Sequence, residues 1–485
     1  MSSFLIDVKG NSQVKLGNYN IDEVLKEIQQ ELDKDIALPH SLKSLIKVLL
    51  IIVPLLCQRL GLNSRNSSKP PSSDPNRDKK TAKSSQGKPG GQKGHKGSTL
   101  EQVAVPDHVE LLQIDRHALP EGDYKNDTPE KRQVVDIDIS VEVTEYQAEV
   151  LIEQHSGKRF VATFPAGVNK AVQYGNAVKA HAVYLSQYQL LPYQRIQDYF
   201  EQYLKLPLST GTVFNFNQEA YEGLAQFEQC CIRQLLRAQV VHFDETGINI
   251  NKKRGWLHCA ASEKWTVFLP HEKRGTEAMN EMGVLPLFTG IAVHDHWKPY
   301  YQYPCSHALC NAHHLRELTF AHEQDNQAWA GDMRKLLTEI NDKCVGDSLT
   351  AIHTDLFRQQ YRDILKAADK TCPEPVRAPD DKRRGRLQRS KSRNLLERLR
   401  DYEDDVLRFM QKPDVPFTNN HGENEIRMTK VHQKISGCFR SMEGAKTFCR
   451  VRSYLNTCRK HGVTAGEAMT LLFRGQLPAF VKDAE

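Results

Sequence analysis

Residues 239–250 have the sequence Gln239-Val-Val-His-Phe-Asp-Glu-Thr-Gly-Ile-Asn-Ile. The β-branched residues predict a strand, and Asp244 lies near its middle. A carboxylate flanked by apolar residues in a strand is costly to bury unless it is paired or binds a metal. Asp244 is therefore the first candidate functional residue.

A second apolar stretch, Leu287-Phe-Thr-Gly-Ile-Ala-Val-His-Asp-His-Trp, places Asp295 at the end of another predicted strand. Two more strands, Gly255–Ala261 and Trp265–Leu269, and then a short helix are predicted between these two. The order strand, strand, strand, helix, strand is that of a ribonuclease-H-like fold, in which the first and fourth strands lie side by side. We therefore expect Asp244 and Asp295 to meet.

A third carboxylate lies in Phe417-Thr-Asn-Asn-His-Gly-Glu-Asn-Glu-Ile-Arg-Met, where one of the paired asparagines is predicted to cap a helix. Glu423 and Glu425 compete for this role, because positions two apart do not share a helix face. Arg427 and Lys430 follow on the Glu423 side and offer cations suited to phosphate. We therefore favour Glu423, although a single carboxylate of this kind is more often part of a surface ion pair.

Three carboxylates that converge repel one another, and hard cations with oxygen ligands relieve that repulsion. We expect two Mg²⁺ (or Mn²⁺) ions, with Asp244 bridging both and with Asp295 and Glu423 each holding one. Such a pair would activate a water or a 3′-hydroxyl against a phosphodiester. Asp244, Asp295 and Glu423 are thus the predicted catalytic and metal-binding residues.

The whole chain has 485 residues, more than one hydrophobic core usually supports, so several domains are expected. Its composition, with 39% hydrophobic and 26% charged residues, is that of a soluble globular protein. The longest apolar stretch is too short for a membrane helix, and no signal peptide is visible at the N-terminus, so we expect a cytoplasmic, nucleoid-associated protein. The eleven cysteines form no C-x-x-C pair and are expected to be thiols.

Positive charge is concentrated in three segments, residues 63–97, 382–400 and 427–460, which together carry +23. The net charge of the chain is +6, so the remaining residues carry −17. Any one basic run is often only a solvated face, but three together favour a polyanionic partner, namely DNA. The predicted DNA-binding residues are Lys88, Lys93, Lys96, Arg383, Arg384, Arg386, Arg427, Lys430, Lys434, Arg440 and Arg452.

The fold class expected from these patterns is multidomain α/β, with a ribonuclease-H-like catalytic core and an all-α insertion. Ser209 is predicted to cap the second helix of a helix-turn-helix-like pair, an arrangement that is also common in proteins that do not bind DNA. The predicted segments are 1–62, an N-terminal helical or coiled-coil segment; 63–101, a basic flexible linker; 102–168, a small β module; 169–236, a helical, helix-turn-helix-like DNA-binding domain; 237–318 with 417–475, the catalytic domain; 319–416, the α-helical insertion; and 476–485, a tail.

Several of these stretches resemble the transposases of the insertion sequence sixty-six family, specifically the large catalytic subunit with its DDE triad. The resemblance rests on the linker sequence Asn63-Ser-Arg-Asn-Ser-Ser-Lys-Pro-Pro-Ser-Ser-Asp, on His242-Phe-Asp-Glu-Thr-Gly, on His294-Asp-His-Trp-Lys-Pro-Tyr and on the block from Pro416 onward. Aligned on the paired asparagines, Glu423 takes the place of the catalytic glutamate. The resemblance implies cut-and-join DNA transposition with a divalent metal.

Two departures from the family concern metal and phosphate contacts. The β module of the family usually carries paired cysteines for zinc, and the module here has none, so it looks like a degenerate zinc finger and we do not expect zinc as a cofactor. Asn424 also stands where the family commonly has arginine. A separate cluster has zinc-ligand residue types, but its spacing fits no closed tetrahedral pattern, and we expect it to pack behind Asp295. Its members are Cys305, His307, Cys310, His313 and His314.

The leading hypothesis is a metal-dependent DNA transposase that cleaves and joins strands at the ends of its insertion sequence. Its expected partners are the terminal inverted repeats, target DNA, a second or further copy of the chain on DNA and small accessory transposition proteins, with no membrane. Two alternatives remain open: a catalytically silent DNA-binding relic of a transposase, and a hydrolytic nuclease on the same fold that cuts without joining.

Overall fold

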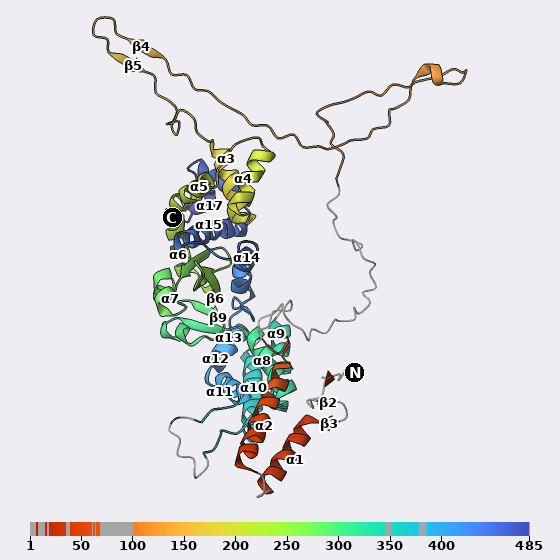
Figure 1. The fold of residues 1–485 in the computed structure, drawn as a ribbon, viewed down its shortest axis with the longest axis vertical. Helices are drawn as coiled ribbons and strands as arrows, with labels where there is room; N and C mark the ends of the chain where they lie inside the picture. The colour runs from red at the N-terminus through yellow and green to blue at the C-terminus, as the bar shows by residue number, and fades with distance from the viewer. Residues whose placement is uncertain are drawn as a thin grey trace. The chain divides into compact units, whose positions relative to one another are not determined.

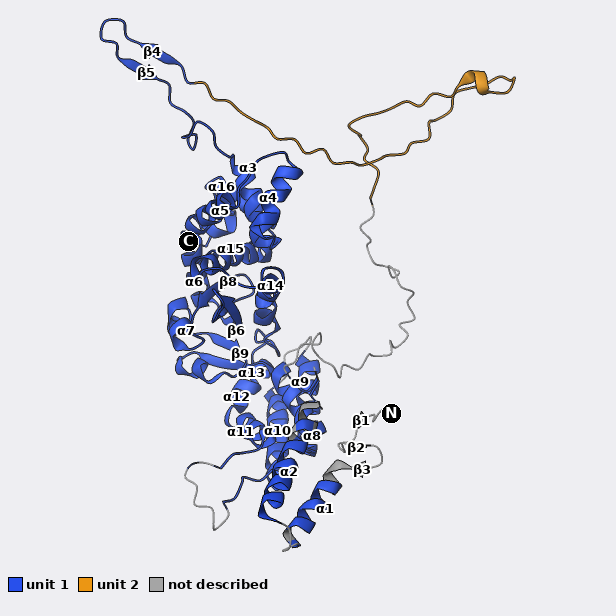
Figure 2. Cartoon of the chain, in the orientation of Figure 1, with its two compact units in different colours: residues 1–77, 148–485 blue, residues 78–147 orange. Residues whose placement is uncertain are grey.

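A computed structural model describes residues 6–7, 15–16, 19–34, 39–60, 62–63, 65–67, 100–344, 351–377, 385 and 387–484. Two compact units divide the chain, as Figure 2 shows. Unit 1 comprises Met1–Arg77 and Ala148–Glu485, and unit 2 comprises Asp78–Gln147. The candidate carboxylates all belong to unit 1.

The centre of unit 1 is a mixed five-stranded sheet with the order β10-β9-β6-β7-β8. β6, β9 and β10 run parallel, whereas β7 and β8 are antiparallel to their neighbours. The adjacency of the first and fourth predicted strands is thus confirmed, and β10 is a strand that the sequence did not predict. The strands are β6 (Val240–Ile250), β7 (Lys253–Ala261), β8 (Thr266–His271), β9 (Ile291–His294) and β10 (Ser306–Leu309).

Between β8 and β9 the chain forms the predicted short helix α7 (Thr276–Met282), followed by the 3-10 turn η4 (Leu285–Leu287). The return to the sheet is close, because a Cβ at Gly290 would lie 2.6 Å from the Gln239 carbonyl. Glycine at this position lets the chain that enters β9 approach the chain that enters β6. A second 3-10 turn, η5 (Lys298–Gln302), connects β9 to β10.

Helices on both sides of the sheet bury its two faces. One core combines Phe243 of β6 with apolar residues of the helices that precede the sheet and of three helices near the C-terminus, including Phe227 and Tyr454. These helices are α3 (Asn176–Val183), the π-helical turn η3 (Tyr184–Tyr188), α4 (Tyr193–Gln202), α5 (Thr210–Gly223), α6 (Ala225–Arg237), α15 (Met442–Lys460), α16 (Ala465–Phe473) and α17 (Ala479–Lys482). The predicted cap of α5 is confirmed, since the Ser209 side chain accepts a hydrogen bond from the Thr212 amide.

The segment between β10 and the last carboxylate is helical, as predicted. Its core contains Val293 and Leu309 of the sheet edge, so the inserted helices pack directly on β9 and β10 (Figure 1). The helices are α8 (Asn311–Gln324), α9 (Ala328–Cys344), α10 (Ala351–Thr371), α11 (Lys391–Asp401), α12 (Glu403–Val406) and α13 (Arg408–Gln411).

After the insertion the chain returns as α14 (Asn420–Ser436), which contacts β6 and β7 (Figure 1). The apolar side of this helix packs against the sheet through Ile426, in a core that also contains Ile248 and Phe268. Beyond α14, Phe439 pairs with the end of β6: its amide donates to the Asn249 carbonyl over 2.9 Å. Both ends of α14 are therefore fixed to the central strand.

At the N-terminus the predicted helical stretch is present as α1 (Ile21–Lys34) and α2 (His40–Leu60). Three two-residue strands, β1 (Ile6–Asp7), β2 (Lys15–Leu16) and β3 (Tyr19–Asn20), precede these helices. Most of the predicted basic linker, residues 68–99, lies outside the described residues.

The strand prediction for residues 102–168 was wrong over most of its length. The alternating stretch Val134–Val143 forms no strand, and its apolar side chains are exposed. A period-two pattern gives a strand only where a second strand completes the hydrogen bonds, and no partner lies beside this one in the described part of unit 2. What forms instead is the 3-10 turn η2 (Arg116–Ala118) and a short exposed hairpin of β4 (Val150–Ile152) and β5 (Arg159–Val161).

Within the described residues, none of the helices is both long enough and apolar enough to cross a membrane.

Candidate active site

The strand register brings the two predicted aspartates together. His242 of β6 is paired with Val293 of the parallel strand β9. Asp244 and Asp295 each lie two residues beyond this pair, so both belong to the same face of the sheet on neighbouring strands. Asp244 lies within β6, and Asp295 directly follows the last residue of β9. The sequence prediction that these residues meet is confirmed at the level of the backbone.

The N-terminal turn of α14 is docked on the same face by one asparagine. The side-chain Nδ2 of Asn419 donates to the Phe243 carbonyl over 2.9 Å, and the side-chain Oδ1 of Asn419 lies 2.7 Å from the His242 Nδ1. Asn419 precedes α14 as its cap residue, but its side chain bonds to β6 and not to the helix. Gly422 allows this contact, because a Cβ there would lie 3.2 Å from the Asn419 Oδ1 and 3.4 Å from the His242 Cβ.

Glu423 and Glu425 leave α14 in different directions, as the helix-face argument predicts. The Glu425 side chain is only 5% exposed and lies among Asn456, Arg459 and Lys460 of α15. Its Oε1 is 3.5 Å from the Lys460 Nζ, so its charge is already paired. The Glu423 side chain is 30% exposed and is close enough to Asp244 for the two charges to repel. Of the two glutamates, Glu423 therefore faces the aspartates.

The carboxyl of Asp244 is electrostatically strained. Burial raises its pKa to about 8, and the charges of Glu245, Asp295 and Glu423 act in the same direction, while a hydrogen bond from the Glu245 amide opposes them. Within the described residues no lysine or arginine forms an ion pair with Asp244 or Asp295. Oxygen donors whose mutual repulsion is not relieved by protein cations are the ligands that Mg²⁺ and Mn²⁺ prefer, so the three carboxylates fit such ions.

Glu245, the neighbour of Asp244, belongs to a supporting network. Its carboxylate accepts from Arg274 over 2.8 Å and from the Tyr300 hydroxyl over 2.5 Å. The Arg274 guanidinium lies 4.1 Å from the centre of the Trp297 ring and 5.0 Å from that of Trp256. The network fixes the loop after Asp295 against β6 and β7, because Tyr300 and Trp297 both follow Asp295 in the chain. No sequence pattern marked these residues as functional.

The predicted Cys/His cluster separates into two groups. His307 lies 3.1 Å from His294, the residue before Asp295, and so packs behind the site as expected, while Cys305 and His314 are buried. Cys310 and His313, in contrast, face Glu423. Among the described residues, Cys310, His313 and Glu423 form a compact set of possible metal ligands, because their ligand atoms all lie within 4.8 Å of one another. Asp244, Asp295 and Glu423 do not form such a compact set.

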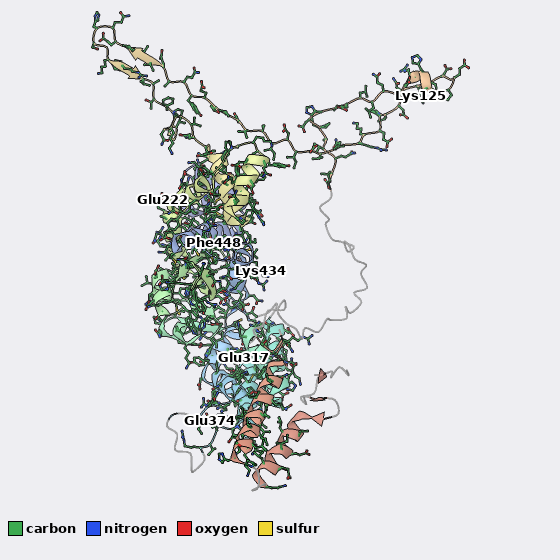
Figure 3. The ribbon with its side chains drawn as sticks, in the orientation of Figure 1. Lys125, Glu222, Glu317, Glu374, Lys434 and Phe448 are labelled. Atoms are coloured by element: carbon green, nitrogen blue, oxygen red, sulfur yellow. The ribbon has the colours of Figure 1, made fainter. Side chains whose placement is uncertain are left out.

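Some of the predicted DNA-binding residues are accessible and one is not. Arg427, Lys434 and Arg440 are exposed, and Lys434 is labelled on α14 in Figure 3. Lys430 is also exposed, but its Nζ donates to the Gly247 carbonyl over 3.1 Å. Lys88, Lys93, Lys96, Arg383, Arg384 and Arg386 lie outside the described residues.

The prediction that Arg452 contacts DNA was wrong. This side chain is 3% exposed, donates to the Gln187 carbonyl over 3.4 Å and lies over the Tyr188 ring. Burial lowers its pKa to about 10. Arg452 therefore joins α15 to η3 inside unit 1 and is not available to a phosphate.

Arg398 of α11 is a candidate that the sequence analysis did not single out. It forms an ion pair with Glu317 of α8, which Figure 3 labels, and its Nε is buried with no hydrogen-bond partner among the described residues. Burial lowers its pKa, and the charges of Tyr301 and Asp295 partly offset that effect. A guanidinium from the insertion thus lies near the second aspartate, and only the folded chain reveals its position.

Sequence comparisons assign most of unit 1 to a known family. Residues 171–447 match the family described as Transposase IS66 family, and residues 17–101 match a family of unknown function (DUF6444). The chain is also similar to the uncharacterized protein y4jO of Sinorhizobium fredii, with 30% identity over 115 residues, which span 23% of this chain and 36% of that protein.

Proposed function

The chain belongs to the IS66 family of transposases, and from this premise we propose that it cleaves DNA at the ends of its insertion sequence and joins the freed ends to target DNA. The observation that carries the proposal is the placement of Asp244 and Asp295 on neighbouring strands, with Glu423 of α14 near enough for its charge to act on Asp244. These residues come from three separate segments, and the fold gathers them where their negative charges repel. Such an arrangement is stabilised when it binds cations.

The sheet order supports a ribonuclease-H-like core, with an antiparallel half, a parallel half and Asp244 on the central strand. In this proposal Asp244, Asp295 and Glu423 would hold two divalent ions, Mg²⁺ or Mn²⁺. When bound, such a pair supplies activation of a water or a 3′-hydroxyl and stabilisation of the leaving oxygen. Asn419 and Gly422 position Glu423 for this role by docking α14 on β6.

The proposed DNA path follows the exposed basic side of α14. Arg427 and Lys434 are exposed on that helix, and Arg440 is exposed just beyond its end. Because phosphate contacts release counterions, cations beside the carboxylates would hold the DNA backbone without reading its sequence. The helices α4 and α5 form the helix-turn-helix-like pair that we propose for recognition of the terminal inverted repeats.

The proposed partners extend to a second copy of the chain, because two transposon ends must be held together for joining. Small accessory transposition proteins complete the proposed assembly. A catalytically silent relic would bind the same DNA without cleavage, and a nuclease on this fold would release cut ends without joining them. Product analysis distinguishes all three functions.

The experiment uses the flanking DNA of the gene as donor and scores cleavage and joining with Mg²⁺. Wild type is compared with Glu423→Gln, with Glu425→Gln as the competing glutamate and with Glu339→Gln as a surface control on α9, where the Glu339 side chain is 55% exposed. We expect Glu423→Gln to abolish both steps, whereas the other two variants retain them. Loss of a metal-binding carboxylate typically removes several powers of ten in rate.

Two results would refute the proposal. Joining by Glu423→Gln at the wild-type rate would remove Glu423 from the site. The second result is DNA binding by the wild type that depends on salt but leads to neither cleavage nor joining in Mg²⁺ or Mn²⁺, even when accessory proteins of the same genetic element are supplied. That result would identify the silent relic.

A further inference from the structure

Glu423 contacts two side chains that the proposed reaction does not use. The Cys310 Sγ lies 3.9 Å from the Glu423 Oε1, and the His313 Nδ1 lies 3.9 Å from the same oxygen. All three ligand atoms are within 4.8 Å of one another. A thiol, an imidazole and a carboxylate therefore surround one point beside the carboxylates.

The backbone holds this arrangement in place. Cys310 directly follows β10 and precedes α8, so His313 occupies the first turn of that helix. The backbone N–H of Asn311 donates to the Phe417 carbonyl over 3.0 Å, and the backbone N–H of Asn419 donates to the Cys310 Sγ over 3.1 Å. These bonds tie the start of α8 to the start of α14, so the three side chains are brought together before any ligand binds.

A second observation concerns the imidazole of His313. The His313 Nδ1 is buried and has no hydrogen-bond partner among the described residues. Buried polar atoms without a partner are rare in folded proteins, because each loses its hydrogen bonds to water without gaining others. The unpaired nitrogen faces the Glu423 carboxylate and the Cys310 sulfur, which are the other members of the cluster.

We propose that Cys310, His313 and Glu423 bind a zinc ion, and that zinc bound there withdraws Glu423 from the catalytic metal ions. Thiolate and imidazole ligands select Zn²⁺ over Mg²⁺, which prefers oxygen ligands alone. Three protein ligands leave a fourth tetrahedral position for water, as in other open zinc sites. The thiol proton passes to solvent when the metal binds.

The distances fit a tetrahedral ion after a small adjustment. With the usual zinc bond lengths, a sulfur and an oxygen ligand are about 3.5 Å apart, and a nitrogen and an oxygen ligand about 3.3 Å. The corresponding distances here are both 3.9 Å. Each pair must therefore close by about half an ångström, which side-chain rotation provides without moving α8 or α14.

The inhibitory half of this inference rests on the proposed function, because it requires that Glu423 serve catalysis. The binding half does not. Zinc and the catalytic ions would compete for one carboxylate, so zinc binding and strand joining would exclude each other. The site would make DNA joining sensitive to the concentration of free zinc.

The binding test uses Co²⁺ as a spectroscopic substitute for zinc in the full-length, reduced and chelator-treated protein. We expect a sulfur-to-cobalt charge-transfer band that Zn²⁺ abolishes by displacement. Cys310→Ser should lose the band, and the control Cys438→Ser, a thiol outside the cluster, should keep it. His313→Asn and Glu423→Gln should each weaken binding by at least about 100-fold, since even the loss of an outer partner of a metal ligand costs 10- to 100-fold.

A band of equal intensity in wild type and Cys310→Ser, or no band in either, would overturn the zinc site. His313→Asn keeps the test decisive if Cys310→Ser fails to fold, because its cobalt affinity must then fall while the band position is kept. Circular dichroism of each variant confirms that it is folded.

The inhibition test measures strand joining in Mg²⁺ against rising Zn²⁺, with each variant normalised to its own zinc-free rate. We expect the inhibitory zinc concentration to rise at least about 100-fold in His313→Asn. A cobalt band that depends on Cys310, without any strand joining by the wild type, would keep the zinc site and refute the proposed function. Joining that is equally sensitive to zinc in wild type and variant would refute the inhibition.

Discussion

Replacing Asp244 by Asn should stabilise the metal-free protein, and more so as the pH rises. Burial, reinforced by the charges of Glu245 and Asp295, raises the pKa of Asp244 in the folded protein to about 8 from its ordinary value of 3.8. Between these two values the folded state keeps a proton that the unfolded state has released. The free energy of unfolding therefore falls as the pH rises through this window, and it changes no further above the folded pKa. Asn has the same shape and cannot ionise, so the substitution removes this penalty.

The interval between the two pKa values sets an upper limit of about 6 kcal/mol, at about 1.4 kcal/mol per pH unit. The carboxyl of Asp244 keeps partial access to solvent, which reduces its cost. We therefore expect Asp244→Asn to raise the free energy of unfolding by about 1 to 3 kcal/mol above pH 8 and by almost nothing near pH 4.

The assay is chemical denaturation at several pH values between 5.5 and 8.5 with EDTA present. It is followed by the fluorescence of the four tryptophans of the chain, of which Trp256, Trp265 and Trp297 lie in or beside the sheet and Trp329 lies in α9. Asp332→Asn serves as a control, because that side chain is 61% exposed on α9 and already hydrated. Added Mg²⁺ should stabilise the wild type more than the variant, so that the wild type then has the higher free energy of unfolding. A gain that is independent of pH, or a loss of stability at pH 8.5, would refute the electrostatic account of the site.

Three further predictions concern the helix that carries Glu423, the proposed DNA path and the buried Arg452. Gly422→Ala should lower the rate of strand joining by at least about tenfold and the free energy of unfolding by about 1 kcal/mol, because the new Cβ would lie 3.2 Å from the Asn419 Oδ1. Joining rates and melting curves measured on the same preparation check these two values. Arg427→Ala and Lys434→Ala should each weaken DNA binding alike on any sequence and reduce the slope of log affinity against log salt by about 1, as measured by fluorescence anisotropy at several salt concentrations. Arg452→Leu should leave that slope unchanged and alter the free energy of unfolding by about 1 to 3 kcal/mol, since its charge is buried inside unit 1.

The sheet could be predicted from sequence because each of its longer strands is marked locally. β6 to β9 are apolar runs bounded by turns or by a short helix, and their order along the chain restricts the topology. β10 was missed because its four residues, Ser306–Leu309, lie between a cysteine and a helix rich in histidine, and that composition drew attention to metal ligands. Val134–Val143 shows the opposite error. Apolar and polar residues alternate in it, but no strand in the described part of the chain pairs with it.

The site was predictable to the extent that backbone order determines it. Asp244 and Asp295 follow from the adjacency of β6 and β9, and the choice of Glu423 follows from helix periodicity and from the resemblance to the family. Burial was not predictable in the same way. Arg452 lies in a basic run like Arg427, yet the folded helix α15 turns it inward. Cys310 and Glu423 are separated by 113 residues, so no local pattern could have joined them.

The contacts of Asn419 link the residues of both proposed metal sites. Its side chain binds His242 and Phe243 of β6, its amide donates to the Cys310 sulfur, and its carbonyl accepts from the Glu423 amide over 3.1 Å. One residue thus links the strand that carries Asp244, the turn that carries the thiol and the helix that carries the shared glutamate. Because these contacts are hydrogen bonds to backbone and polar atoms, hydrophobic periodicity does not encode them, and a change at Asn419 should disturb the carboxylates and the zinc ligands together.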